Sequence, residues 1–160
     1  MMKPEYTDKH CKNVLKAFVL PGLPHPLLCA DRKEPWLKVR KAFDKIAQEI
    51  EQLNPDVIIL YSTYWASILG HQIQAHPTPK WTLVDDEWHE LGSIPYEFKM
   101  DVEFAKAWNE ANIERGLKSR TVAYDGFPID TGSVVCLKLI NPQNKFKACI
   151  VSSNIYSDRA

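Results

Sequence analysis

The chain has 160 residues, of which 45% are hydrophobic and 25% charged, proportions typical of one globular domain with a substantial core. Lysine plus arginine and aspartate plus glutamate each total 20, so the formal net charge is zero. This balance argues against nucleic acid or a membrane surface as the main partner, and no apolar run approaches the roughly 20 residues that span a bilayer. We expect a single domain over residues 1–160, with residues 1–14 as a flexible N-terminus.

The four cysteines are widely spaced and form no C-x-x-C pair, so neither a zinc ribbon nor a thioredoxin-type site is indicated. Cys136 and Cys149 lie in apolar runs, where buried free thiols are expected. Unpaired thiols of this kind are typical of the reducing cytoplasm, which is the location we expect.

The first half of the chain predicts a strand, an irregular segment, a helix and a second strand. We expect a short buried strand over Lys16–Leu20, and no regular structure in the proline-rich stretch 21–28. From Pro35 to Leu53, apolar residues recur at spacings of four and three, which indicates an amphipathic helix. Asn54-Pro55 ends it, and the continuous apolar run 57–61 predicts a strand covered on both faces. Strand, helix and strand would form a right-handed βαβ unit.

The second half continues the alternation of strands and helices. The expected elements are a strand over 81–84, an acidic loop over 85–90, a helix from Asp101 to about Arg115 followed by Gly116, a strand over 121–124, a helix over 133–140 and a strand over 147–152. Together they predict the α/β class: a three-layer α/β/α domain with a mostly parallel or mixed central sheet. Because no helix follows the last strand, we expect the sheet to be incomplete at its C-terminal edge.

Ligands of open α/β sheets sit beyond the carboxyl ends of the strands, where four loops offer polar side chains. The candidates are His25 in the first loop; Tyr64, His71 and His76 in the second; Asp85, Asp86, Glu87 and His89 in the third; and Asp125 and Asp130 in the fourth.

Several of these residues also have ordinary structural explanations. His25 is either a turn residue or an imidazole aimed rigidly by its two flanking prolines. His71 could cap a helix or bond a backbone carbonyl, His76 could lie on the surface, and Asp130 is most simply a helix cap. Spacing alone establishes no metal triad, and no dinucleotide, Walker or nucleophile-elbow motif is present.

The order of PGLPHPLL, NPDVIILYSTYW, IPYEFKMD, GFPIDTGSVVCLKLINP and KACIVSSNIY resembles the N-terminal part of the class III extradiol ring-cleavage dioxygenases, of the protocatechuate 4,5-dioxygenase type. The resemblance runs from about residue 17 to residue 156 and covers roughly the first half of the family domain. It implies an iron-dependent family that opens catechol or aminophenol rings, and within it the chain is most similar to iron-free subunits of two-subunit members.

The resemblance also implies roles for individual positions. His25 takes the place of the first iron-binding histidine, whereas Tyr64, in Ser62-Thr63-Tyr64-Trp65, stands where a second histidine would bind iron. Thr131 replaces the histidine of a D-H-G segment, and the remaining carboxylate ligand would lie beyond residue 160. A phenol with a pKa of about 10 binds metal only after losing its proton, and threonine cannot transfer protons near neutral pH.

Three hypotheses follow. In the first, the chain is a non-catalytic subunit without a cofactor of its own, which supports a homologous catalytic subunit that carries Fe(II). In the second, it is an active enzyme in which His71 or His89 and the carboxylate of Asp85 or Glu87 join His25 around Fe(II). In the third, it is a binding module in which the apolar loops, Trp65, Trp88 and His25 hold an aromatic small molecule without chemistry.

Overall fold

The computed structural model describes residues 13–156, so the expected flexible segment 1–14 lies almost wholly outside the described residues. The elements are α1 (His25–Leu28), η2 (Ala30–Arg32), α2 (Glu34–Leu53), β1 (Val57–Ser67), β2 (His71–Gln74), β3 (Lys80–Val84), η3 (His89–Leu91), β4 (Ser93–Glu97), α3 (Val102–Glu114), β5 (Ser119–Val122), α4 (Thr131–Ile140) and β6 (Lys147–Asn154).

A four-stranded sheet with the order β1-β6-β2-β5 forms the centre of the fold. β1 pairs with β6 in parallel and β2 pairs with β5 in parallel, whereas β2 and β6 are antiparallel. β3 and β4 form a separate antiparallel hairpin. The predicted α/β class with a mixed sheet is therefore confirmed.

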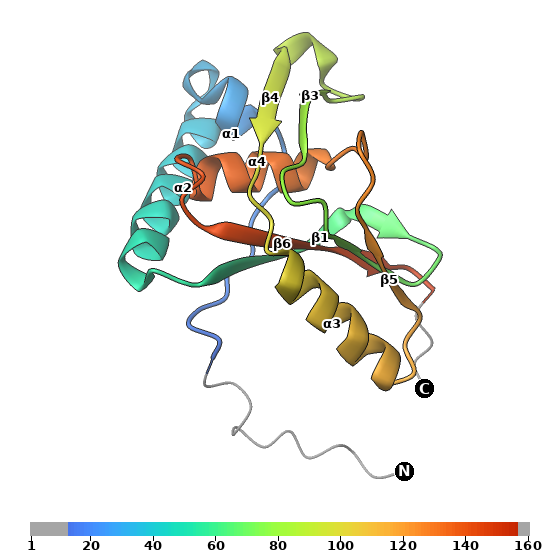
Figure 1. Cartoon of the computed structure of the whole chain (residues 1–160). Coiled ribbons are helices and arrows are strands. Elements are labelled where there is room, and N and C mark those ends of the chain that lie inside the picture. The colour runs from blue at the N-terminus through green and yellow to red at the C-terminus, as the bar shows by residue number, and fades with distance from the viewer. Residues whose placement is uncertain (1–12, 157–160) are drawn as a thin grey trace, which may run out of the picture.

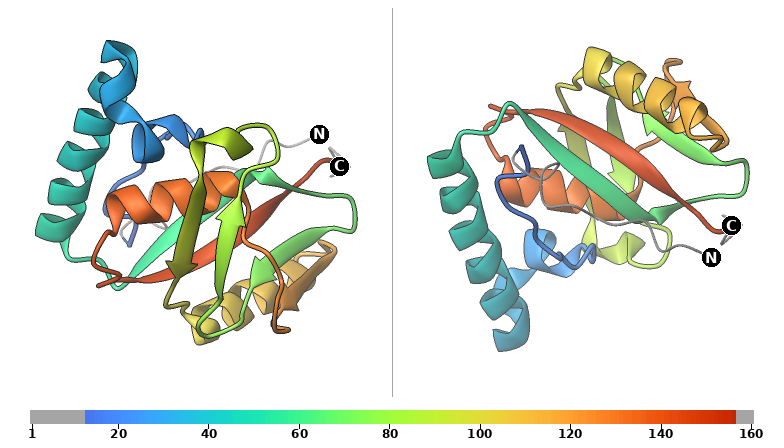
Figure 2. Two further views of the ribbon diagram at one scale, coloured as in Figure 1. Left: turned by 90° about the horizontal axis from the view of Figure 1, so that it is seen from above. Right: turned by 90° about the horizontal axis from the view of Figure 1, so that it is seen from below.

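Elements cover both faces of β6, but one face of β1 is open: Ile59 and Tyr61 are exposed, so the prediction that the strand over 57–61 is covered on both faces is wrong. α4 and the β3–β4 hairpin lie on one side and α3 lies on the other (Figures 1 and 2). Strand β6 shows the division residue by residue: Ala148 and Ile150 belong to the core shared with α2 and α4, while Cys149 and Val151 belong to the core under α3. This alternation is what a strand buried on both faces produces.

The long helices form as their sequences predict. In α2, Phe43 and Ile50 are buried, and Asn54 ends the helix in the left-handed conformation. Asp101 caps α3 by accepting a hydrogen bond of 3.1 Å from the amide of Phe104. Gly116, with φ of +78°, follows its end, a conformation that favours glycine.

The prediction for the N-terminal segment is wrong in two respects. Lys16–Leu20 is not a strand, because no backbone hydrogen bond joins it to any strand in the described part of the chain. Phe18 and Leu20 still pack against the core, but the βαβ unit is not formed. The proline-rich stretch 21–28 contains the helical turn α1, since prolines are tolerated in the first turn of a helix.

The prediction of a loop that carries Tyr64, His71 and His76 is also wrong, because most of this segment is strand. β1 continues to Ser67, and β2 follows after a tight turn at Gly70, whose φ is +97°. Strand β4 was not predicted, because Pro95 interrupts the strand-forming pattern. The strands over 81–84 and 147–152 and the helix over 133–140 are confirmed, each with a small extension.

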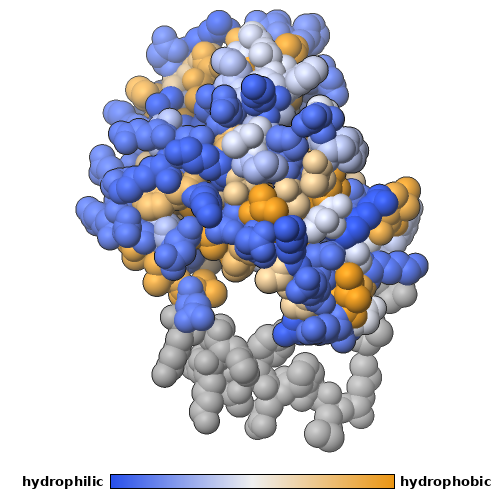
Figure 3. Space-filling view, in the orientation of Figure 1, coloured by the Kyte–Doolittle hydropathy of each residue, from blue (hydrophilic) through white to orange (hydrophobic). Residues whose placement is uncertain are grey.

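Apolar side chains are scattered among hydrophilic ones on the face of the molecule shown in Figure 3. Between residues 13 and 156, no helix is both long and apolar enough to cross a membrane.

Candidate functional site

Tyr64 lies in an irregular part of β1. Ser62 pairs with Ser152 of β6, and the next pair joins Ala66 to Ser153, so residues 63–65 have no partners on β6. A bulge of this kind locally re-aims the side chains of the longer strand. The bulge therefore sets the direction of Tyr64.

The Tyr64 ring packs between two glycines. A Cβ atom added to Gly132 would lie 2.7 Å from Cδ2 of Tyr64, and one added to Gly22 would lie 2.8 Å from Cε2 of the same ring. Both distances are too short for real carbon atoms. Gly22 precedes α1 and Gly132 lies in the first turn of α4, so one edge of the phenol ring packs where these two segments meet β1, while half of the Tyr64 surface is exposed.

Asp130 connects α4 to the bulge. Its Oδ1 accepts hydrogen bonds from the Ser133 amide at 2.9 Å and from the Ser62 hydroxyl at 2.9 Å, while Oδ2 accepts from the Ser133 hydroxyl at 2.7 Å. The Trp65 amide in turn donates to the Ser62 hydroxyl at 3.3 Å. The predicted helix cap is confirmed, and it also fixes the backbone on either side of Tyr64.

Asp85 makes a second connection to α4. Its Oδ2 accepts a hydrogen bond of 2.6 Å from the Thr131 hydroxyl. Its Oδ1 accepts from the amides of Trp88 and Glu87 at 2.9 and 3.1 Å. One carboxylate thus joins the start of α4 to the loop that connects β3 and β4.

His25 is held in an aromatic stack. Its ring lies 4.5 Å from that of Trp36 in a stacked arrangement and 4.6 Å from that of Trp88 edge-on. Its Nδ1 is buried without a hydrogen-bond partner, as is Nε1 of Trp88. Trp65, the other aromatic residue predicted at the site, packs against Phe127 with a centroid distance of 5.3 Å.

Charges near the site oppose ionisation of Tyr64. Burial, followed by the nearby carboxylates of Asp85 and Glu87, raises the pKa of the Tyr64 phenol above its ordinary value. Burial alone would raise the pKa of Asp85, but hydrogen bonds from Thr131, Trp88 and Glu87, together with the nearby His25, lower it. At neutral pH the site therefore presents a neutral phenol beside an ionised carboxylate.

These residues do not fit an iron ion. Iron(II) sites of the two-histidine, one-carboxylate type need three converging donors, whereas residues 13–156 contain no group of three or more histidine, cysteine, aspartate or glutamate side chains placed to share a metal. His25 and Asp85 are the nearby donors, and the neutral phenol of Tyr64 is a poor third. The rearranged iron site, with His71 or His89 beside His25, is not formed in this structure.

The remaining candidates lie elsewhere or serve the fold. His71 begins β2 and its amide bonds the Lys118 carbonyl at 2.8 Å, so it caps no helix. His76 is not simply a surface residue, because its Nε2 lies 2.8 Å from Oδ1 of Asp125 and its Nδ1 accepts from the Thr78 amide.

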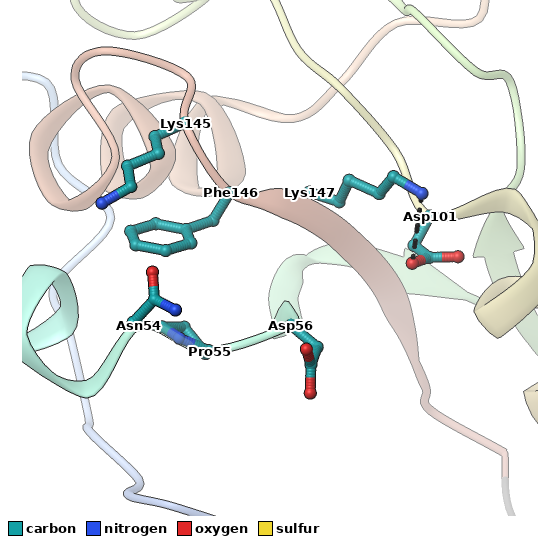
Figure 4. A pocket seen from close by; sticks show the side chains of 7 residues that line it. All are labelled: Asn54, Pro55, Asp56, Asp101, Lys145, Phe146 and Lys147. Atoms are coloured by element: carbon teal, nitrogen blue, oxygen red, sulfur yellow. Dashed lines mark ion pairs between the residues drawn. The ribbon is translucent and has the colours of Figure 1, made fainter.

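Two open hollows lie away from this site. The first, of about 400 Å³, is lined by Asn54, Pro55, Asp56, Asp101, Lys145, Phe146 and Lys147 (Figure 4). The second lies beside it, between the C-terminal half of α2 and the segment 140–146 at the end of α4 and beyond it. Both are near the amino ends of β1 and β6, whereas His25, Tyr64 and Thr131 line neither.

Sequence reasoning missed Trp36 and the two glycines as parts of the site. The Gly22 contact had no local signal, since it depends on an aromatic ring 42 positions away. Asp85 was a candidate as a metal ligand, but its role as a hydrogen-bond acceptor for Thr131 was not visible from spacing.

Residues 17–158 match the family model described as the catalytic LigB subunit of aromatic ring-opening dioxygenase. Over 148 residues the chain is 33% identical to a 2-aminophenol 1,6-dioxygenase alpha subunit and 26% identical to a beta subunit, both from Pseudomonas sp.. These alignments cover 92% and 88% of this chain, but 54% and 48% of the relatives, so the chain spans about half their length.

Among solved structures, the chain is similar to an uncharacterized protein from Escherichia coli K12, with 14% identity and a TM-score of 0.49. The alignment covers 71% of this chain and 39% of the E. coli chain. The family match, in contrast, includes the His25, Tyr64 and Thr131 segments and nearly all described residues. The chain therefore belongs to the LigB family of class III extradiol ring-opening dioxygenases.

Proposed function

We propose that this chain is a non-catalytic subunit that supports an iron-bearing homologue in the cleavage of catechol or aminophenol rings. The observation that carries the proposal is the position of Tyr64. Its ring packs against Gly22 and Gly132, at the position where the family resemblance implies an iron-binding histidine. Because the pKa of this phenol is raised, it stays protonated at neutral pH and offers no anionic oxygen to a metal.

The relatives support a two-subunit arrangement. Two that match this chain are named as alpha and beta subunits of 2-aminophenol 1,6-dioxygenase, and the identity is higher to the alpha subunit. We propose the same arrangement here: this chain as the iron-free member and a homologue with Fe(II) as its partner. The buried free thiols of Cys29, Cys136 and Cys149 support a cytoplasmic location.

In this proposal, the site residues occupy the family's positions for iron binding and proton transfer but no longer carry out these functions. His25 is a vestigial or weak ligand, Tyr64 marks a lost ligand, and Thr131 marks a lost proton-transferring histidine. Trp65 and Trp88 are the proposed contacts for an aromatic ring. Fe(II) and oxygen chemistry belong to the partner.

The test is a replacement experiment. This chain is co-expressed with a tagged Pseudomonas 2-aminophenol 1,6-dioxygenase beta subunit, and the purified material is assayed for cleavage of 2-aminophenol and catechol. We expect the two chains to co-purify, and we expect this chain alone to be inactive when supplied with Fe(II) under anaerobic loading.

His25→Ala separates the supporting role from a catalytic one. If the chain only supports its partner, this variant should change the turnover of the complex by less than about twofold. Loss of ring cleavage in the variant, or turnover by this chain alone, would show that it carries the chemistry itself. Failure to co-purify would remove the supporting role.

A further inference from the structure

We propose that residues 85–92, here called the hairpin loop, form a lid over His25 that is latched by the hydrogen bond between Thr131 and Asp85. The inference does not rest on the proposed function, because it concerns the closure of the site in this chain alone. It assigns to Asp85 a positioning role: holding the hairpin loop against the start of α4.

The latch is a single side-chain bond between separate parts of the fold. The Thr131 hydroxyl donates to Oδ2 of Asp85 at 2.6 Å, which is short, as expected for a hydroxyl bonded to a carboxylate. The hairpin connects β3 to β4, which pair with each other and not with the central sheet. Buried Ile94 and Tyr96 anchor β4 in the core, whereas the bond from Thr131 to Asp85 is what joins the loop itself to α4.

Asp85 also shapes the lid itself. Its other oxygen accepts the amides of Glu87 and Trp88 at 3.1 and 2.9 Å, which turns the chain directly after β3. This turn places the Trp88 ring edge-on against His25, with 4.6 Å between the centroids. Asp85 thus fixes both the end of the loop and the aromatic residue that covers His25.

Two polar atoms of the contacting His25 and Trp88 side chains have no hydrogen-bond partner. Nδ1 of His25 and Nε1 of Trp88 are buried and accept or donate no hydrogen bond. An unsatisfied buried polar group is costly, and water reaching it removes that cost. The two unpaired nitrogens therefore destabilise the closed position of the loop, whereas the hydrogen bonds of Asp85 and the aromatic stack stabilise it. A small difference between such opposing free energies is expected of a segment that opens.

The opened state would expose the part of the site that the closed state hides. Moving the hairpin loop away uncovers the His25 ring and the start of α4 without disturbing Tyr64, which is held separately by Gly22 and Gly132. A small aromatic molecule could then enter between the rings of His25 and Trp88. The latch would thereby control access to the site.

Hydrogen–deuterium exchange of the isolated chain tests the latch. Thr131→Val removes the hydroxyl and keeps the shape, whereas Thr131→Ser keeps the hydroxyl. We expect Thr131→Val to speed exchange in residues 86–92 by about tenfold or more, as expected from losing one bond to a charged group, with no comparable change in α3. Thr131→Ser should behave as wild type.

Asp85→Ala and Asp86→Ala form a matched pair, since both remove a carboxylate from the same loop but Asp86 is exposed. Asp85→Ala should speed exchange in the loop and shift the indole signal of Trp88 in an NMR spectrum, and Asp86→Ala should do neither. Unchanged exchange in the loop of Thr131→Val and Asp85→Ala would overturn the proposal, as would faster exchange spread evenly over the whole chain.

Discussion

Replacing Gly132 by alanine tests the packing of Tyr64 directly. In an ordinary helix position this change stabilises the protein by up to about 1 kcal/mol. Here the new Cβ would lie 2.7 and 2.9 Å from Cδ2 and Cγ of Tyr64, and overpacking of this kind costs about 1–3 kcal/mol. We therefore expect Gly132→Ala to lower the free energy of unfolding, although alanine is the better helix former.

The prediction becomes quantitative in a double-mutant cycle with Tyr64→Ala. Once the ring is absent, the closest remaining neighbour of the new Cβ is Oδ1 of Asp130 at 3.3 Å, and Gly132→Ala should become neutral or stabilising. The difference between its effects in the two backgrounds should be about 1–3 kcal/mol, in the range for residues in contact. Urea unfolding with linear extrapolation measures it.

Gly22→Ala provides the matched comparison. Its Cβ would lie 2.8 Å from Cε2 of Tyr64 but also 2.7 Å from the backbone Cα of Gly132, so removing the ring should not relieve its effect fully. A coupling below about 0.5 kcal/mol between Gly132→Ala and Tyr64→Ala would show that the ring does not occupy the space between the glycines.

Two further predictions concern stability. Asp101→Ala removes a helix cap that accepts one amide hydrogen bond and should lower the free energy of unfolding by about 1 kcal/mol. Asp130→Ala removes an acceptor of three hydrogen bonds and should lower it by at least twice as much. Equal losses in urea unfolding would contradict the role of Asp130 as a connection between α4 and β1. Burial raises the pKa of the Cys136 and Cys149 thiols to about 12, above the value in an unfolded chain. The contribution of the two buried thiols to the free energy of unfolding is therefore complete below about pH 9. It is lost as the pH rises toward 12, by about 1.4 kcal/mol per pH unit for each thiol, because only the unfolded chain then loses their protons. Cys149→Ala should make this alkaline decline shallower, and an unchanged slope would refute the prediction.

Local signals predicted the helices well. The stripe containing Phe43 and Ile50, the proline in the first turn of α2 and the cap at Asp101 all act within a few residues of the element they define. The short apolar segment Lys16–Leu20 has the composition of a strand, but strand formation requires a neighbouring edge, and no strand in the described residues pairs with it.

The geometry of the site was harder to predict because it depends on distant segments. The bulge at residues 63–65 exists only through pairing with β6, some ninety residues later. The bond from Thr131 to Asp85 joins positions 46 apart. The sequence identified Tyr64 and Thr131 as departures from a family pattern, but only the folded chain brings the Tyr64 ring between two glycines and joins Thr131 to a carboxylate.

The central claim is that Tyr64 fills the place of a metal ligand, so this chain holds no iron of its own. The most direct test is an anaerobic titration of the purified chain with Fe(II), followed by desalting and measurement of iron content. We expect far less than one iron per chain, unchanged in His25→Ala. One iron per chain that is lost in His25→Ala would contradict it.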